Sequence, residues 1–171
     1  RIYDRSFRKT GEHSASVSVP ALASREIIPD VPGNDFLEGS GFASLHLRDK
    51  GRLVSDNFYW LSQDGNFGFL ASLPSVSLKV SAERELRDGH AVVRVRLKNS
   101  GSSPAFFIAL RVERKEGKEI LPSFWSDNYL SLLPGDSRDI TWTAYDEISA
   151  QEPIQLKLEG WNVTAQAIMV D

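Results

Sequence analysis

Alternation of apolar and polar residues runs through almost the whole chain and constrains its fold more than any other feature. Between residues 91 and 97 every second residue is Ala, Val or Leu, whereas Arg94, Arg96 and Lys98 occupy the other phase. The same period of two recurs at 76–80, 106–112, 138–144 and 154–158. Such a period gives each of a series of half-buried strands one apolar face. No segment keeps a helical apolar stripe over the length of a normal helix, so the sequence predicts an all-β protein.

The part of the chain from residue 75 to residue 171 has the strand number of a complete β-sandwich domain. Turn signals such as Asp88-Gly89 and Pro134-Gly135 separate its alternating segments. Seven strands are predicted, at residues 76–84, 90–98, 105–114, 119–125, 128–132, 138–144 and 154–162. This number, in a domain of about 100 residues, is typical of an immunoglobulin-like sandwich. The predicted interior consists of Val93, Val95, Phe106, Ile108, Leu110, Ile140, Trp142, Leu156 and Leu158.

The first part of the chain, residues 1–62, has fewer strands than such a sandwich needs. Five strands are predicted there, at residues 1–8, 14–19, 24–28, 41–48 and 52–60, with Asp49-Lys50-Gly51 as a three-residue hairpin loop. Five strands in about sixty residues form a poor independent sandwich. We therefore expect a partial immunoglobulin-like domain, truncated at its N-terminal side. Residues 63–74 include Phe67, Phe69 and Leu73, so this linker is expected to pack against both domains.

Composition narrows the classes of function. Hydrophobic residues make up 41% of the 171 residues and charged residues 25%, which is typical of a folded globular chain. The net charge of −3 provides no basic surface for nucleic acid. No apolar run approaches the ~20 residues of a membrane-spanning helix, so no membrane partner is expected. The chain has no cysteine, which excludes disulfides and zinc-thiolate sites.

The polar residues form no recognisable catalytic or metal-binding pattern. The 23 Asp and Glu residues fall mostly in turns and on the polar phases of strands, where solvated carboxylates are expected. The histidines His13, His46 and His90 are far apart and lack metal-ligand spacing. We therefore predict no catalytic residue, no metal and no cofactor in this chain. Asn162-Val163-Thr164 is a glycosylation sequon, a triplet that often arises by chance.

One segment combines aromatic residues with an Asp-Asn pair. Trp125 and Tyr129 flank Asp127 and Asn128, just before the Pro134-Gly135 turn. Asp and Asn readily bond neighbouring backbone groups, so a structural turn is one interpretation. Contact with another domain or with a bound glycan is the other. Trp60 ends a strand near the linker, and we predict that it packs at a domain interface.

Three segments are similar to signatures of a known enzyme family: Val54 to Trp60, Leu73 to Val80, and Phe124 to Asp136. They resemble the C-terminal immunoglobulin-like domains of family-two glycoside hydrolases. The most similar branch contains β-mannosidases, exo-β-D-glucosaminidases and the endo-β-mannosidases that act on mannosylglycoproteins. In this family the segment like 54–60 lies on the closing strand of the penultimate domain, which implies that the opening strands of the first unit precede Arg1.

The resemblance implies an accessory role and not a catalytic one. In the family, two glutamates on a (β/α)8 barrel cleave β-mannosides or β-glucosaminides with retention, and this chain shows neither a barrel pattern nor a catalytic motif. The implied partners are the barrel of the same parent chain and, through it, a glycan. The chain would buttress the barrel and help to shape its active-site mouth, in a periplasmic or extracellular enzyme. The truncated first unit could also self-associate. The alternative is a free-standing carbohydrate-binding or adhesion module.

Overall fold

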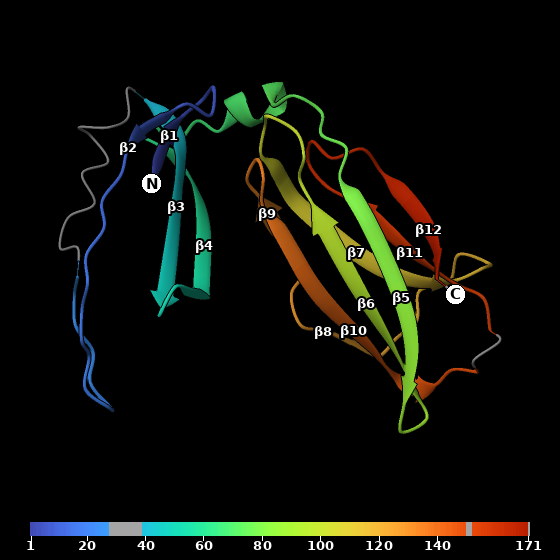
Figure 1. Cartoon of the computed structure of the whole chain (residues 1–171). Helices are drawn as coiled ribbons and strands as arrows, with labels where there is room; N and C mark the ends of the chain where they lie inside the picture. The colour runs from blue at the N-terminus through green and yellow to red at the C-terminus, as the bar shows by residue number, and fades with distance from the viewer. Residues whose placement is uncertain (28–38, 150–151, 171) are drawn as a thin grey trace. The chain divides into compact units, whose positions relative to one another are not determined.

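The computed structural model describes residues 1–27, 39–149 and 152–170 and divides the chain into two compact units, Arg1–Ser72 and Leu73–Asp171. Figure 1 shows strands throughout, joined by turns and one short 3-10 helix. The predicted all-β class is therefore confirmed.

The first unit is a single four-stranded antiparallel sheet. Its strands are β1 (Ile2–Asp4), β2 (Lys9–Gly11), β3 (Ser40–Asp49) and β4 (Arg52–Ser62), in the order β2-β1-β3-β4. The 3-10 helix η1 (Gly68–Ser72) follows. Phe42 on β3 is fully buried, and its ring contacts those of Phe7, Phe58 and Phe69. An aromatic cluster thus takes the place of an inter-sheet core. That the linker 63–74 also packs on the second unit stays a prediction.

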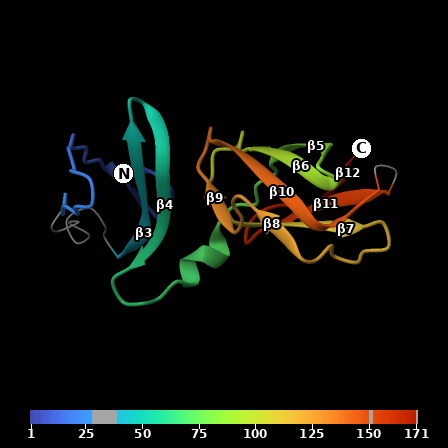
Figure 2. The same ribbon diagram turned by 90° about the horizontal axis from the view of Figure 1, so that it is seen from below.

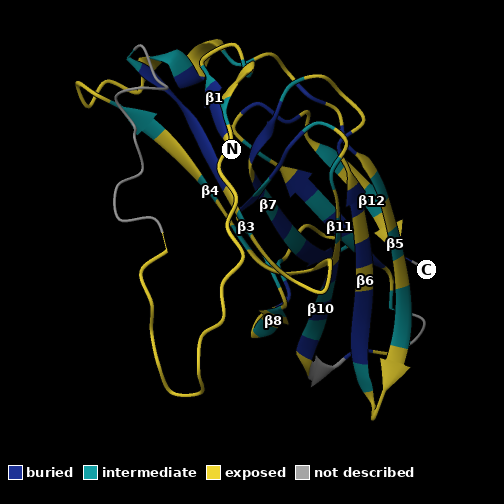
Figure 3. Ribbon diagram, turned by 60° about the vertical axis from the view of Figure 1, so that its left-hand side comes forward, coloured by how far each residue is buried: buried dark blue, intermediate teal, exposed yellow. Residues whose placement is uncertain are grey.

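Two predicted strands of the first unit are wrong. The described residues between Glu12 and Ile27 form no strand, and Figure 3 shows this segment as exposed, whereas 14–19 and 24–28 were expected to pair. Residue 28 lies outside the described residues. The alternation at 14–19 ends at Pro20, which lacks an N–H for a sheet ladder. Val17 and Val19 are accordingly exposed.

Two further expectations for this unit change in detail. The predicted strand 1–8 ends at Asp4 with β1, because a turn follows in which the Asp4 carboxylate accepts hydrogen bonds from the backbone N–H of Ser6 and Arg8, and β2 begins only at Lys9. The loop between β3 and β4 has two residues, because Asp49 pairs with Arg52. Lys50 and Gly51 both have positive φ, at 47° and 84°, which is the geometry of a type I′ hairpin turn.

The second unit is a sandwich of two four-stranded antiparallel sheets (Figures 1 and 2). One sheet has the order β5-β6-β10-β8, with β5 at Lys79–Arg87, β6 at His90–Lys98, β10 at Ser137–Glu147 and β8 at Ser123–Trp125. The other has the order β12-β11-β7-β9, with β12 at Gln166–Val170, β11 at Ile154–Glu159, β7 at Ala105–Arg114 and β9 at Leu130–Leu132. The chain crosses between the sheets at every connection from β6 to β11, whereas β5–β6 and β11–β12 are hairpins within one sheet.

The sandwich interior contains the residues that alternation predicted, except that Ala105 belongs to the central cluster in place of Phe106. Val93, Val95, Ile108, Leu110, Ile140, Trp142, Leu156 and Leu158 all belong to the central cluster. Phe106 is buried but lies outside that cluster, and the neighbouring Ala105 belongs to it instead. The cause is a β-bulge in β7, described below. Sequence reasoning also missed β12, and it made one long strand of 119–125, where only Ser123–Trp125 is a strand.

Candidate interaction surface

The segment Ser126–Tyr129 joins β8 to β9, so it carries the chain from one sheet of the sandwich to the other. Its first residue extends the pairing of β8 with β10. The Ser126 N–H donates to the carbonyl of Thr141 at 2.8 Å, and the Ser126 hydroxyl accepts from the Thr141 N–H at 2.9 Å. Trp125, which precedes it, is half-buried against the core, with its ring 6.4 Å from that of Trp142. Trp125 is therefore a packing residue and not an exposed platform.

Asn128 makes the backbone hydrogen bonds that were predicted for the Asp-Asn pair. Its Oδ1 accepts from the N–H of Leu110 and from the N–H of Tyr129, both at 2.9 Å. Its Nδ2 donates to the carbonyl of Leu110 at 3.0 Å. Asp127 makes an ion pair instead, with 3.4 Å between its Oδ2 and Nη1 of Arg138. The turn is thus held by Asn128, while Asp127 ties it to β10.

Tyr129 and Phe107 form an exposed aromatic pair. Tyr129 is 63% exposed and Phe107 is 46% exposed, and their ring centroids lie 5.6 Å apart. In the pairing of β7 with β9, Ala105 lies opposite Leu132 and Ile108 opposite Leu130, so that Phe106 and Phe107 face the single residue Ser131. This is a β-bulge, and Phe107 sits in it with φ of 54°. The Phe107 N–H donates to the Ser131 hydroxyl at 3.3 Å.

Sequence reasoning paired Tyr129 with Trp125 and overlooked Phe107. The available signal was the position of Phe107 on the polar phase of the 106–112 alternation, where a large aromatic residue is out of place. Trp60 belongs to the other unit, where it lies opposite Phe42 in the pairing of β3 with β4 and is 40% exposed. The structure therefore brings Asp127, Asn128 and Tyr129 together beside Phe107. That Trp60 packs at a domain interface stays a prediction.

The outer face of β7 also carries an ion-pair network, farther along the strand from the aromatic pair. Glu113 is buried, with a side chain only 7% exposed, contrary to the expectation of solvated carboxylates. Its Oε2 lies 2.7 Å from Nζ of Lys157, and its Oε1 lies 3.5 Å from Nε of Arg111. Arg111 also donates to Glu159 at 2.7 Å. The partners of this buried carboxylate are cations, whereas a retaining glycosidase needs a second carboxyl group.

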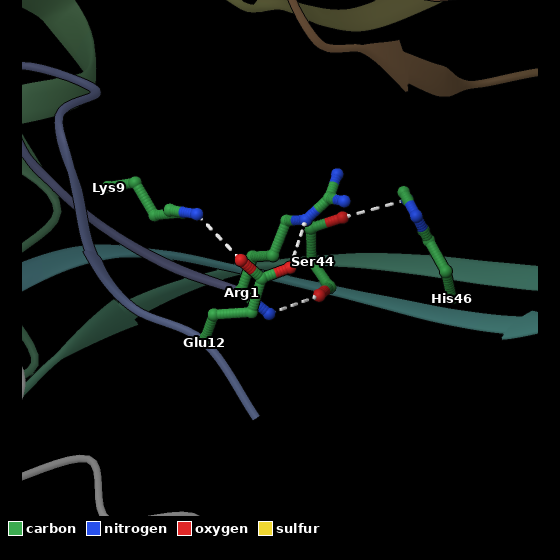
Figure 4. Close-up of polar contacts among 5 residues, drawn as sticks. All are labelled: Arg1, Lys9, Glu12, Ser44 and His46. Carbon is green, nitrogen blue, oxygen red and sulfur yellow. Dashed lines mark hydrogen bonds and ion pairs between the residues drawn. The ribbon is translucent and has the colours of Figure 1, made fainter. Parts of the chain in front are cut away.

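A second charged cluster lies in the first unit (Figure 4). Glu12 accepts hydrogen bonds from Nζ of Lys9 at 2.6 Å and from Nε of Arg1 at 2.9 Å. These hydrogen bonds, that of Lys9 first, lower the pKa of the Glu12 carboxyl to about 2. Nearby on β3, the hydroxyl of Ser44 lies 3.0 Å from Nε2 of His46. Exposed ion pairs thus tie Glu12, which follows β2, to Lys9 on β2 and to Arg1, which precedes β1.

Metal and membrane sites are not found in the part of the chain that the structure describes. Those residues contain no group of three His, Asp or Glu side chains that could hold a metal ion. No helix within the described ranges is long and apolar enough to cross a membrane.

The side chain of Asn162, the first residue of the sequon, joins two separate backbone segments, at Pro74 and at 104–106, by hydrogen bonds. The Asn162 side chain is buried, and its Nδ2 donates to the carbonyls of Pro74 and Pro104 at 2.7 and 2.9 Å. Its Oδ1 accepts from the N–H of Phe106 at 2.8 Å. The side-chain amide nitrogen that a glycan would modify is therefore buried and already hydrogen-bonded in the folded protein. Sequence reasoning treated the triplet as chance and did not foresee this structural role.

The fold and the family are now defined by comparison with known proteins. A family model described as the exo-β-D-glucosaminidase Ig-fold domain matches residues 57–163. The second unit is thus an immunoglobulin-like sandwich, and the chain belongs to the exo-β-D-glucosaminidase Ig-fold domain family.

Curated relatives agree. The exo-β-D-glucosaminidase of Amycolatopsis orientalis is 29% identical over 189 residues, which cover 95% of this chain and 18% of the relative. That of Arthroderma benhamiae is 27% identical, covering 94% of this chain and 20% of the relative. The chain thus spans about a fifth of the length of these curated relatives.

Solved structures extend the similarity over both units. The exo-β-D-glucosaminidase CsxA, solved in a study of its inhibition by a glucosamine-configured castanospermine, matches with a TM-score of 0.81 at 26% identity. This match covers 98% of the present chain and 22% of CsxA. A complex of the Amycolatopsis orientalis exo-chitosanase CsxA with PNP-β-D-glucosamine matches with a TM-score of 0.80 at 26% identity, with the same coverage.

Proposed function

We propose that this chain is the non-catalytic C-terminal region of a glycoside hydrolase that removes terminal β-D-glucosamine residues. The observation that carries the proposal is the family match over residues 57–163, together with relatives that are themselves exo-β-D-glucosaminidases. The buried carboxylate in the sandwich, Glu113, is flanked by cations and has no carboxyl partner. β-Mannosides, the other substrate class suggested by the sequence, have no support among those relatives.

In this proposal the chain buttresses the catalytic barrel of the same longer protein and contributes to one wall of its active-site mouth. The continuous buried core of the sandwich and the hydrogen bonds of the Asn128 side chain to Leu110 suit a supporting role. We also propose a periplasmic or extracellular location, because an enzyme that trims the ends of a polymer works where the polymer is.

The test is a comparison of this chain with the full-length protein that contains it. Purified alone, the 171-residue chain should not hydrolyse an aryl β-D-glucosaminide, whereas the full-length protein should. An aryl β-D-mannoside serves as the substrate control. Turnover by the isolated chain that survives repurification would overturn the proposal, as would a full-length protein that prefers the mannoside.

A free-standing carbohydrate-binding or adhesion module is the second candidate function. The exposed pair Phe107 and Tyr129 favours it, because aromatic faces stack on sugar rings. Calorimetric titration of the isolated chain with glucosamine oligosaccharides separates the two functions, since a buttress binds no sugar appreciably.

We further propose that the first unit self-associates when it is separated from the rest of the protein. β4 is an edge strand of 11 residues, and β3 pairs with β1 only through Gly41, Phe42 and Ala43. Leu45, Leu47 and Tyr59 are exposed on this hairpin. Long apolar edges recruit other strands. Sedimentation of the isolated chain at several concentrations tests this proposal. A chain that remains monomeric at all concentrations would refute the self-association.

A further inference from the structure

Two large aromatic residues of the sandwich adopt a backbone conformation that bulky side chains avoid. Phe107 and Tyr129 both have φ of 54°, which lies in the left-handed region. For a non-glycine residue this region is costly, and such outliers persist only where the surrounding structure enforces them. Here the two strained residues are also in contact with each other, at 5.6 Å between ring centroids. The two strained backbone positions therefore belong to one local arrangement, the contact between these two rings.

Independent contacts enforce that arrangement on both sides of the pair. On β7 the bulge places Phe107 against the hydroxyl of Ser131. On the connection before β9, Asn128 holds the N–H of Tyr129 while its other bonds grip both backbone groups of Leu110. Both rings nevertheless remain about half exposed or more. Burial of the rings within this chain therefore does not offset the backbone strain of their positive φ.

Charged residues follow the aromatic pair along the outer face of β7 and on the neighbouring β11. Beyond Phe107 the outward positions of β7 are Ala109, Arg111 and Glu113, and Arg111 and Glu113 belong to the ion-pair network with Lys157 and Glu159. An aromatic centre with a charged rim is the usual anatomy of a binding hot spot. The two rings are tilted by 44° against each other and do not form one flat face; this exposed pair is called the Phe107–Tyr129 knob.

We infer that the Phe107–Tyr129 knob docks into an apolar recess on the catalytic part of the same longer protein. This inference rests on the proposed function. The length of this chain suggests the partner of the knob. The chain covers only 22% of the matched glycosidase, so the remainder of such a protein offers a surface that the knob can contact. Docking the knob would bury the two rings and offset the backbone strain.

The experiment compares hydrogen exchange in the full-length protein and in the isolated chain. In the full-length protein we expect the amides at 105–110 and 128–132 to exchange roughly tenfold more slowly or better, because docking closes the local openings. In the double variant Phe107→Gly with Tyr129→Gly this extra protection should disappear. Glycine accepts positive φ, so the same variant of the isolated chain should melt at an unchanged or higher temperature.

A matched control uses Phe124 and Tyr145, which are both 61% exposed and lie on β8 and β10 of the other sheet. The double variant Phe124→Ser with Tyr145→Ser should leave the protection at 105–110 unchanged. Equal exchange rates in the two wild-type proteins would overturn the inference. Glucosamine oligosaccharides that bind the isolated chain, and fail to bind its double glycine variant, would also overturn it in favour of a sugar ligand. A full-length protein without glucosaminidase activity that still shows the protection would refute the proposed function while leaving the docking contact intact.

Discussion

The side chain of Asn128 pairs with the backbone of Leu110 through both its oxygen and its nitrogen, at 2.9 and 3.0 Å. This is the pattern by which a residue on a neighbouring strand would pair with Leu110. β9 begins only at Leu130, so the amide side chain continues the β7–β9 ladder beyond the last backbone pair, Ile108 with Leu130. One side chain thus fixes where the crossing segment leaves the sheet.

Replacement of Asn128 tests this relationship. Asn128→Ala leaves the N–H and carbonyl of Leu110 without their partners and should lower the free energy of unfolding by about 1–3 kcal/mol. Asn128→Asp keeps the acceptor but loses the donor, so the loss should shrink when the new carboxyl is protonated at low pH. Thermal unfolding of the three proteins across pH measures both effects. A pH-independent loss in the Asp variant would contradict the proposed donor role.

Tyr129 offers a test of backbone strain. Because its φ is 54° and its side chain is largely exposed, Tyr129→Gly should keep or raise stability by up to about 1 kcal/mol. Tyr129→Val should instead lower it by about 1–2 kcal/mol, because a β-branched side chain is least compatible with this region. Denaturant unfolding of the isolated chain compares them. Equal stability of the two variants would show that the residue is not strained.

Gly160 is predicted to be intolerant of any side chain. A Cβ at this position would lie 2.9 Å from Cγ2 of Val163 and 3.1 Å from the carbonyl oxygen of Phe106. Gly160→Ala should therefore cost about 1–3 kcal/mol through overpacking. Gly117→Ala is the comparison, because a Cβ there meets nothing within 4 Å and only the positive φ opposes it. The first variant should be the less stable in calorimetry, and the reverse order would contradict the packing at Gly160.

The Glu12 cluster predicts a pH dependence in the first unit. The pKa of Glu12 is lowered from 4.5 to about 2, chiefly by the hydrogen bond from Lys9 and then by that from Arg1. A lowered pKa in the folded state means that the ionised carboxylate stabilises the fold. This stabilisation is present above pH 4.5 and is lost as the pH falls towards 2.

Carbon-detected NMR titration of the Glu12 carboxyl measures this directly. The midpoint should lie near 2 in the wild type and move upward in Lys9→Met, which removes the principal donor. A wild-type midpoint close to 4.5 would contradict the cluster as described.

Alternation was a reliable guide where a strand buries one face against a second sheet. β6 and the first part of β10 follow their predicted phases because Val93, Val95, Ile140 and Trp142 all enter the same core. β12 escaped notice because its exposed residues Ala167 and Met169 are as apolar as the inward Ile168 and Val170, so no alternation marks the buried face. Residues 14–19 show the opposite case, since a six-residue alternation exists there without a strand to pair with.

The candidate site was foreseen only in part. An Asp-Asn pair between aromatics signals a turn, and the local bonding of Asn128 follows from its chemistry. Its backbone partner depends on the tertiary structure, because Leu110 lies 18 residues away in the sequence. The same holds for Phe107, whose positive φ arises from a bulge that forms only when β7 and β9 pair. Single residues do not encode such a mismatch between two strands.

The occupied amide of Asn162 has a practical consequence for making this protein. Oligosaccharide transfer in a secretory pathway acts on chains that have not yet folded, when the sequon at 162–164 is still accessible. A sugar added then would stand where Pro74, Pro104 and Phe106 must later converge. Production by secretion from yeast or animal cells should therefore divide the chain into unmodified folded molecules and glycosylated ones that never close the sandwich. A bacterial host avoids this competition, and the ratio of the two forms in a eukaryotic host would report how fast the second unit folds.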